Sequence, residues 1–182
     1  MARYQVISQV GRSLTAFNNL LNYIAKPSHC IGRFIGATNL HISAYQNPEL
    51  EIMNQISYVL NHYKAWNRRL ALHVLVEFDP GEAEMLSPEA ALQFGYQFAV
   101  SVFPGYMCYF AVHDNTPLLH LHFMVVTCNI FNGGVFSAGK SGWYKIGNDG
   151  NRMLEQYVGS ENLCPVQVTL GRTPRNKKEV KK

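Results

Sequence analysis

The chain has 182 residues, 47% of them hydrophobic and 15% charged, with a formal net charge of +4. This length and composition are typical of one globular domain and exclude a largely disordered protein. No apolar run approaches the roughly 20 residues of a membrane span, so we expect no membrane insertion. The N-terminus lacks a signal-peptide pattern, and the four cysteines are widely spaced. We therefore expect a cytoplasmic protein without a disulfide framework or a zinc–thiolate site.

The positive charge is concentrated at the C-terminal end. Residues 172–182 contain six lysines and arginines and one glutamate. The rest of the chain is close to neutral, so any nucleic-acid surface on it must be local. We predict one domain over residues 1–170, followed by a basic and disordered tail or linker over 171–182. Such a tail could bind phosphates weakly.

The first part of the chain predicts alternating strands and helices. Arg3 to Val10 alternates apolar and polar residues, as a strand does. Apolar residues at helical spacing follow Ser13, which is a suitable N-cap, and the last turn of this helix carries Tyr23 near the edge of its buried face. A short strand is predicted over 33–41. A helix then opens at Pro48 and is expected to end near residues 66–69.

The middle of the chain contains the strongest strand signals. Residues 70–78 predict a strand in which His73 and Glu77 share one face, and residues 79–82 are expected to break it. A helix begins after Ser87 and ends at Pro104-Gly105. Two further strands follow, over 106–113 and 118–128. Toward the C-terminus, glycines at 147 and 150 weaken the prediction of a helix over 143–157.

Helices and strands in this order, with one tight hairpin, predict an α+β fold. We expect an antiparallel or mixed central sheet with helices mainly on one face. The opposite face would then be open, and the histidines of the last predicted hairpin would point to it.

The most informative stretch is His113-Asp114-Asn115-Thr116-Pro117-Leu118-Leu119-His120-Leu121-His122. Side chains alternate along a strand, so His120 and His122 share a face, and a hairpin would return His113 beside them. Three neutral imidazoles at one point can bind a divalent metal ion and leave open coordination positions. The alternative is a set of ordinary, partly exposed histidines on a sheet.

A metal held by three neutral ligands keeps its full positive charge, which suits polarisation of a phosphate group. The nucleophile for phosphodiester cleavage could be a water molecule or a side-chain hydroxyl. A hydroxyl would conserve the bond energy in a covalent intermediate. The ten tyrosines of the chain supply candidates.

Three sequence blocks together resemble the catalytic domain of relaxases, members of the HUH endonuclease superfamily, and especially the MOB-P class of mobilisation proteins. The first block is Asn22-Tyr23-Ile24-Ala25-Lys26-Pro27. The second is Phe34-Ile35-Gly36-Ala37-Thr38-Asn39, and the third runs from Ala111 to Asn129. Between them, Phe78–Glu82 and Ser87–Ala90 resemble a further stretch of this family. The resemblance covers about residues 1 to 137.

This resemblance implies an RRM-like sheet and a nuclease that is specific for one site and one strand. Tyr23 would attack a scissile phosphate in single-stranded DNA at an origin of transfer, which leaves a 5′-phosphotyrosyl link and a free 3′-hydroxyl. His113, His120 and His122 would hold a divalent ion, Mn²⁺ or Mg²⁺. The cell would be bacterial, and accessory relaxosome and coupling proteins would be further partners in conjugation or plasmid mobilisation.

Several other residues receive supporting roles. Glu77 could accept the tyrosine proton or support the metal, and Asp114 could orient a ligand imidazole. Basic side chains could contact DNA phosphates; these are Arg33, Arg68, Arg69, Lys140 and Lys145. The chain departs from the family pattern at Asn115, where an aspartate is usual, and at Leu118, where a histidine is usual.

Two other functions remain open. The chain could be a rolling-circle replication initiator or transposase of the same superfamily, in which the tyrosine follows the histidine strand; Tyr144 and Tyr157 are then the candidates. It could also be a non-catalytic RRM-like module that binds nucleic acid.

Overall fold

A computed structural model describes residues 2–43 and 48–171, apart from the side chain of Arg33. The basic segment 172–182 lies outside the described residues, so the tail remains a prediction. The elements are β1 (Arg3–Val10), α1 (Leu14–Ile24), β2 (Cys30–Thr38), α2 (Pro48–His62), β3 (Ala71–Glu77), α3 (Pro80–Met85), α4 (Pro88–Val102), β4 (Tyr106–His113), β5 (His120–Asn129), α5 (Lys140–Val158), a 3₁₀ turn (Ser160–Asn162) and β6 (Gln167–Leu170).

The six strands form one sheet in the order β2-β4-β5-β3-β1-β6. All pairs are antiparallel except the edge pair of β1 and β6, which is parallel. The α+β class and the antiparallel centre of the sheet are confirmed. The short β6 was not predicted, because four largely exposed residues carry too little hydrophobic alternation to signal a strand.

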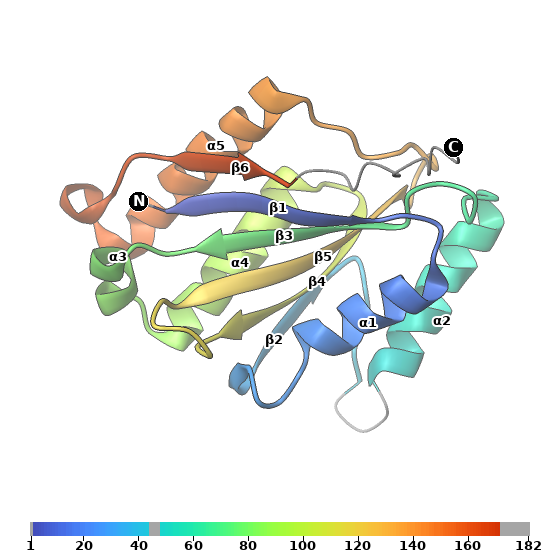
Figure 1. Cartoon of the computed structure of the whole chain (residues 1–182), viewed down its shortest axis with the longest axis horizontal. Coiled ribbons are helices and arrows are strands. Elements are labelled where there is room, and N and C mark those ends of the chain that lie inside the picture. Colours follow the sequence, from blue (N-terminus) through green and yellow to red (C-terminus); the bar gives the residue numbers. More distant parts are fainter. Residues whose placement is uncertain (1, 44–47, 172–182) are drawn as a thin grey trace, which may run out of the picture.

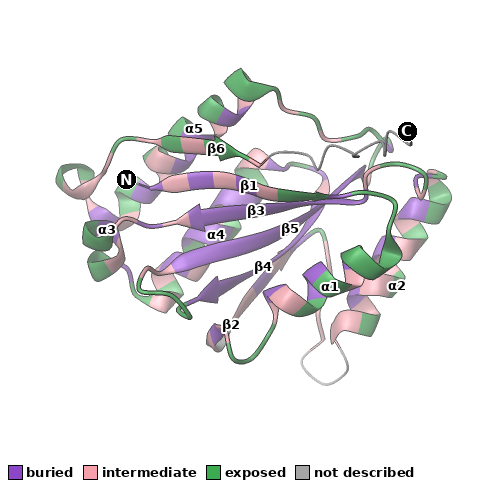
Figure 2. Cartoon of the chain, in the orientation of Figure 1, coloured by how far each residue is buried: buried purple, intermediate pink, exposed green. Residues whose placement is uncertain are grey.

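Helices pack on both faces of this sheet (Figure 1). On one face, α4 and α5 cover an apolar core to which Phe98, Phe110 and Phe123 contribute. On the other face, α1 and α2 form a second core that includes Phe17 and Ile56. The face that we expected to be open is therefore partly covered. Figure 2 shows that β4 and β5 are buried along nearly their whole length.

Helix α1 forms where its sequence predicts it. The Ser13 side chain accepts a hydrogen bond of 3.1 Å from the backbone N–H of Ala16, which caps the helix. Its buried residues lie at helical spacing and anchor it on the sheet; they are Phe17, Leu20, Leu21 and Ile24. This anchoring fixes the position of Tyr23, one residue before the helix ends.

Two helices differ from the sequence prediction. Residues 79–82 were expected only to break a strand, but they begin α3, because Asp79 and Glu82 form a reciprocal capping box. Helix α5 runs without interruption through Gly147 and Gly150. A Cβ atom at Gly150 would lie 2.6 Å from the Tyr4 ring. The glycine therefore allows the helix to approach the sheet closely, which offsets its weak helix propensity.

In the described part of the chain, no helix is long and apolar enough to cross a membrane.

Candidate active site

The hairpin of β4 and β5 brings three histidines together at one end of the sheet. His113 pairs directly with His120, and His122 lies two residues further along β5, on the same face. All three are buried, with exposed fractions of 0 to 4%. One ring nitrogen from each can be chosen so that the three atoms lie within 4.8 Å of one another. The convergence predicted from the sequence is therefore present.

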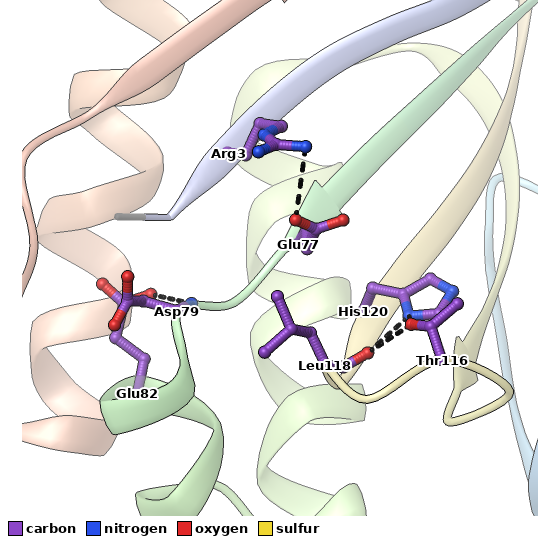
Figure 3. A network of polar contacts seen from close by, with 7 residues as sticks. All are labelled: Arg3, Glu77, Asp79, Glu82, Thr116, Leu118 and His120. Carbon is purple, nitrogen blue, oxygen red and sulfur yellow. Dashed lines mark hydrogen bonds and ion pairs between the residues drawn. The ribbon is translucent and has the colours of Figure 1, made fainter.

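Two of these rings are held by backbone carbonyl groups. Nε2 of His113 is 2.8 Å from the carbonyl oxygen of Ile24, at the end of α1. Nδ1 of His120 is 2.8 Å from the carbonyl oxygen of Leu118, and Thr116 Oγ1 lies 3.3 Å from the same nitrogen (Figure 3). A carbonyl only accepts hydrogen bonds, so each of these nitrogens carries the proton. The opposite nitrogen of each ring is then free to bind a metal ion.

The free nitrogen of His113 provides a test of the metal hypothesis. His113 Nδ1 is buried and has no hydrogen-bond partner among the described residues. Buried polar atoms without a partner are rare and costly, and a bound ion is one accepted reason for them. The donor chemistry therefore fits a divalent ion held by Nδ1 of His113 and by Nε2 of His120 and His122.

His122 connects the histidine group to Tyr23. Its Nδ1 lies 2.8 Å from Nε2 of His73 on β3. Its Nε2 lies 3.3 Å from the Tyr23 hydroxyl oxygen. The Tyr23 ring is also in contact with other imidazoles, at centroid distances of 5.4 Å to His29 and 5.8 Å to His113. Tyr23 is thus the tyrosine that the fold places among the histidines.

Burial sets the protonation of these groups. Desolvation, with a smaller contribution from neighbouring histidines, lowers the pKa of His73 to about 4 and that of His122 to about 2. Burial is also the main cause of the lowered pKa values of His113 and His120. The imidazoles are therefore neutral at pH 7, which is the form that binds metal. Burial raises the pKa of the Tyr23 hydroxyl, which stays protonated at neutral pH.

The two predicted supporting carboxylates lie beside the histidines. Glu77 pairs with His120 across the strands, but its carboxylate is 3.4 Å from Arg3 Nη1 (Figure 3). Asp114 is exposed, and its backbone N–H donates to the His29 carbonyl oxygen at 3.2 Å. The negative charges of both carboxylates raise the pKa of His120 and so partly offset its burial. In the described structure they act on the ligands through their charge.

The predicted DNA contacts are not gathered at this site. Arg68 donates a hydrogen bond of 2.9 Å to the Gly133 carbonyl oxygen, and Arg69 accepts one from Thr127 through its own carbonyl. Both arginines precede β3, which is about 20 Å long at ~3.3 Å per residue and carries Glu77 at its far end. Lys140 and Lys145 are exposed on α5, which packs on the opposite face. The side chain of Arg33 lies outside the described residues.

Three groups that contact the histidines or Tyr23 at this site were not recognised from the sequence. His73 was placed on the same face as Glu77 without a role in the site, and in the structure it contacts His122. His29 was given no role, although its ring lies 5.4 Å from that of Tyr23. The carbonyl of Leu118 holds His120, and the side-chain pattern could not reveal this because any residue supplies a carbonyl. Strand alternation was the one signal that could have identified His73.

Comparisons with known proteins bear on the family and the fold of this chain. A family model for relaxases, described as the MobA/VirD2-like nuclease domain, matches residues 23–158. No curated protein matches the chain.

Two solved structures share the fold. One is described as "Molecular Basis of Vancomycin Resistance Transfer in Staphylococcus aureus"; it has a TM-score of 0.59 and 12% identity, and the match covers 92% of this chain and 97% of that one. The other is the MobM relaxase domain bound to 26-nucleotide pMV158 oriT DNA. It has a TM-score of 0.52 and 17% identity, and the match covers 100% of this chain and 94% of that one.

Proposed function

We propose that this chain, which belongs to the family of MobA/VirD2-like relaxase nuclease domains, nicks one strand of DNA at an origin of transfer with Tyr23 as its nucleophile. The observation that carries this proposal is the contact of 3.3 Å between the Tyr23 hydroxyl and His122, within a group of buried, neutral histidines. The proposed substrate is single-stranded DNA, and the structurally similar MobM relaxase domain is described as bound to oriT DNA.

The reaction exchanges one phosphodiester for another. The Tyr23 oxygen forms a bond to the scissile phosphorus as the bond from phosphorus to the 3′-oxygen breaks. The tyrosine loses its proton, and the departing 3′-oxygen gains one, so a 3′-hydroxyl is released. The 5′-phosphate remains on Tyr23, which conserves the bond energy for rejoining. Glu77, facing His120, supports the site electrostatically and is a candidate to receive the tyrosine proton.

A divalent ion, when bound, would neutralise charge on the scissile phosphate and polarise it. His113, His120 and His122 would hold it. Three neutral imidazoles leave the charge of the ion undiminished. Mg²⁺ prefers oxygen ligands, so of the two expected ions Mn²⁺ matches this donor set better. Asp114 adds long-range negative charge near His113 and His120.

The structure also bears on the alternative tyrosines. Tyr144 and Tyr157 lie on α5, which packs against the opposite face of the sheet from the histidines. The Tyr157 hydroxyl donates to Gln97 at 3.2 Å. Tyr23 therefore fits the histidine site better than either of them, which favours a relaxase over a replication initiator or transposase.

The cellular setting follows from this function. The four cysteines are free thiols, which fits the reducing cytoplasm of a bacterium. Conjugation or mobilisation would bring the domain together with accessory relaxosome and coupling proteins.

A covalent-adduct assay tests the proposal. The full chain is incubated with Mn²⁺ and a random-sequence pool of single-stranded oligonucleotides that carry a label at the 3′ end. We expect a labelled protein band on a denaturing gel, absent in Tyr23→Phe, and sequencing of the attached strands should give one site. A matched control is Tyr144→Phe, which should keep the adduct.

The other outcomes identify the alternatives. An adduct that persists in Tyr23→Phe but disappears in Tyr144→Phe or Tyr157→Phe would indicate an initiator or transposase. Cleavage without any adduct would make water the nucleophile. Tight binding of DNA without cleavage, with Mn²⁺ and with Mg²⁺, would indicate a non-catalytic binding module.

A further inference from the structure

His73 and His122 share a single hydrogen bond inside the sheet. They come from adjacent strands, β3 and β5, and their exposed fractions are only 7% and 4%. Nε2 of His73 lies 2.8 Å from Nδ1 of His122, and the ring centroids are 4.8 Å apart. This contact is buried, so water does not replace it readily if one partner is removed.

The other contact of His122 determines where the shared proton lies. Nε2 of His122 faces the Tyr23 hydroxyl at 3.3 Å and is the atom available to a metal ion. To bind that ion, Nε2 must offer a lone pair, which would place the ring proton of neutral His122 on Nδ1. That N–H then donates to His73 Nε2. The reverse arrangement would put a proton on Nε2 of His122 and block metal binding.

His122 differs from the other two ligands in what holds it. His113 is oriented by the carbonyl of Ile24, and His120 by the carbonyl of Leu118. Backbone carbonyls cannot be removed by substitution. His120 has the Thr116 hydroxyl beside its carbonyl partner, whereas the Nδ1 atom of His122 is held by the His73 side chain without a backbone carbonyl. The orientation of His122 can therefore be tested by mutation.

The chemical nature of this partner matters for the metal. Histidine ligands are commonly held by a carboxylate, which makes the ligand more basic and adds negative charge near the ion. His73 accepts through the lone pair of its Nε2 atom, so its ring is a neutral acceptor. The carboxylate on the same strand, Glu77, is engaged by Arg3 instead. A neutral acceptor orients the ligand without reducing the charge that acts on a phosphate.

We infer that His73 is a positioning residue, which holds His122 in the tautomer and orientation that direct Nε2 at Tyr23 and the metal ion. The inference rests on the proposed metal-binding role of His122. It gives a residue of β3 a role in the site, although all three histidines of the pattern come from β4 and β5.

The test compares two substitutions of His73 in the full chain. Glutamine keeps an acceptor oxygen near the position of Nε2, whereas leucine fills a similar space without one. Mn²⁺ affinity is measured without DNA, from the electron paramagnetic resonance signal of free Mn²⁺. We expect His73→Leu to raise the Kd for Mn²⁺ by roughly 10- to 100-fold, the range for removal of such partners. His73→Gln should stay within a few-fold of wild type.

A spectroscopic measurement separates positioning from folding. In the metal-free chain labelled with ¹⁵N-histidine, the His122 ring should show a protonated Nδ1 in wild type and in His73→Gln, and a mixture of tautomers in His73→Leu. Thermal unfolding shows whether each variant is folded. His62→Leu, which removes an exposed imidazole from the end of α2, should leave both the affinity and the His122 spectrum unchanged.

Several results would overturn the inference. They are an unchanged Kd in His73→Leu, an equal loss in both His73 variants, a wild-type His122 ring protonated on Nε2, or no Mn²⁺ binding by the wild type. The proposed function fails separately: a wild-type chain that binds Mn²⁺ in the His73-dependent way but forms no adduct would refute nicking and leave the positioning role intact.

Discussion

The two faces of the central hairpin serve different purposes, although their residues alternate along the same strands. On one face, Phe110 and Phe123 stack at a centroid distance of 4.9 Å within a core that α4 and α5 close. On the other, the neighbouring His122 lies among imidazoles beside Tyr23. Adjacent residues on one strand thus contribute to stability or to chemistry according to the face they occupy. The following experiments test how complete this separation is.

The largest effect on stability should come from Phe123→Ala. Phe123 is fully buried between aromatic rings, so its removal leaves a cavity and should lower the free energy of unfolding by about 3–5 kcal/mol. Denaturant unfolding measures this. The matched substitution is His122→Ala, which should abolish Mn²⁺ binding and the DNA adduct at a much smaller cost in stability. Equal destabilisation by the two would show that the faces are not separable.

The second prediction is that acid lowers the stability of the fold through the buried histidines. The pKa values of His73, His113, His120 and His122 are lowered by burial, so the unfolded chain binds more protons than the folded one below the ordinary histidine pKa of about 6.5. The stability present at neutral pH should therefore fall as the pH drops from about 6.5 toward 4.

Unfolding curves at a series of pH values would measure this fall. In His73→Gln, which removes one of these groups, the decrease between pH 6.5 and 4 should be shallower, because the native His73 has a pKa of about 4. A decrease as steep as in wild type would argue that His73 does not contribute.

The packing of the core under α4 and α5 can be tested at the contact between α5 and Tyr4 of β1. A Cβ at Gly150 would come within 2.6 Å of Tyr4, which is 1% exposed. Gly150→Ala should therefore lower the free energy of unfolding by about 1–3 kcal/mol. The energetic cost of overpacking exceeds the gain in helix propensity. Gly81→Ala in α3, where nothing lies within 4 Å, should be neutral or slightly stabilising. Thermal unfolding of the two variants checks the difference, and stabilisation by Gly150→Ala would contradict it.

The smallest effect concerns the helix that carries Tyr23. Ser13→Ala removes the N-cap of α1 and should cost about 1 kcal/mol. Adduct formation should be nearly unchanged, because Tyr23 lies at the other end of the helix and its neighbour Ile24 is fully buried. The exposed Thr15 in the same turn is the control, and Thr15→Ala should have little effect. A strong loss of adduct in Ser13→Ala would mean that the whole helix must be intact for catalysis.

Local patterns in the sequence determined much of this protein. Ser13 and the apolar spacing after it identified α1, and strand alternation placed His120 and His122 on one face. The tight hairpin was sufficient to bring His113 beside them. These features depend on neighbours in the chain, so periodicity and capping reveal them.

Only the tertiary structure decided the remaining features. α5 approaches Tyr4 closely at Gly150, where a Cβ atom would collide with the Tyr4 ring. Tyr4 is far away in the sequence, so the local pattern around Gly150 does not reveal this contact. On each of the three rings, the nitrogen opposite the free one is held by the carbonyl of Ile24, the carbonyl of Leu118 or the ring of His73. Side-chain patterns do not specify these contacts, because two of them use backbone carbonyls and the third joins two strands that are distant in the sequence. The sequence therefore identified the three converging histidines, whereas the folded structure determined which nitrogen of each is free.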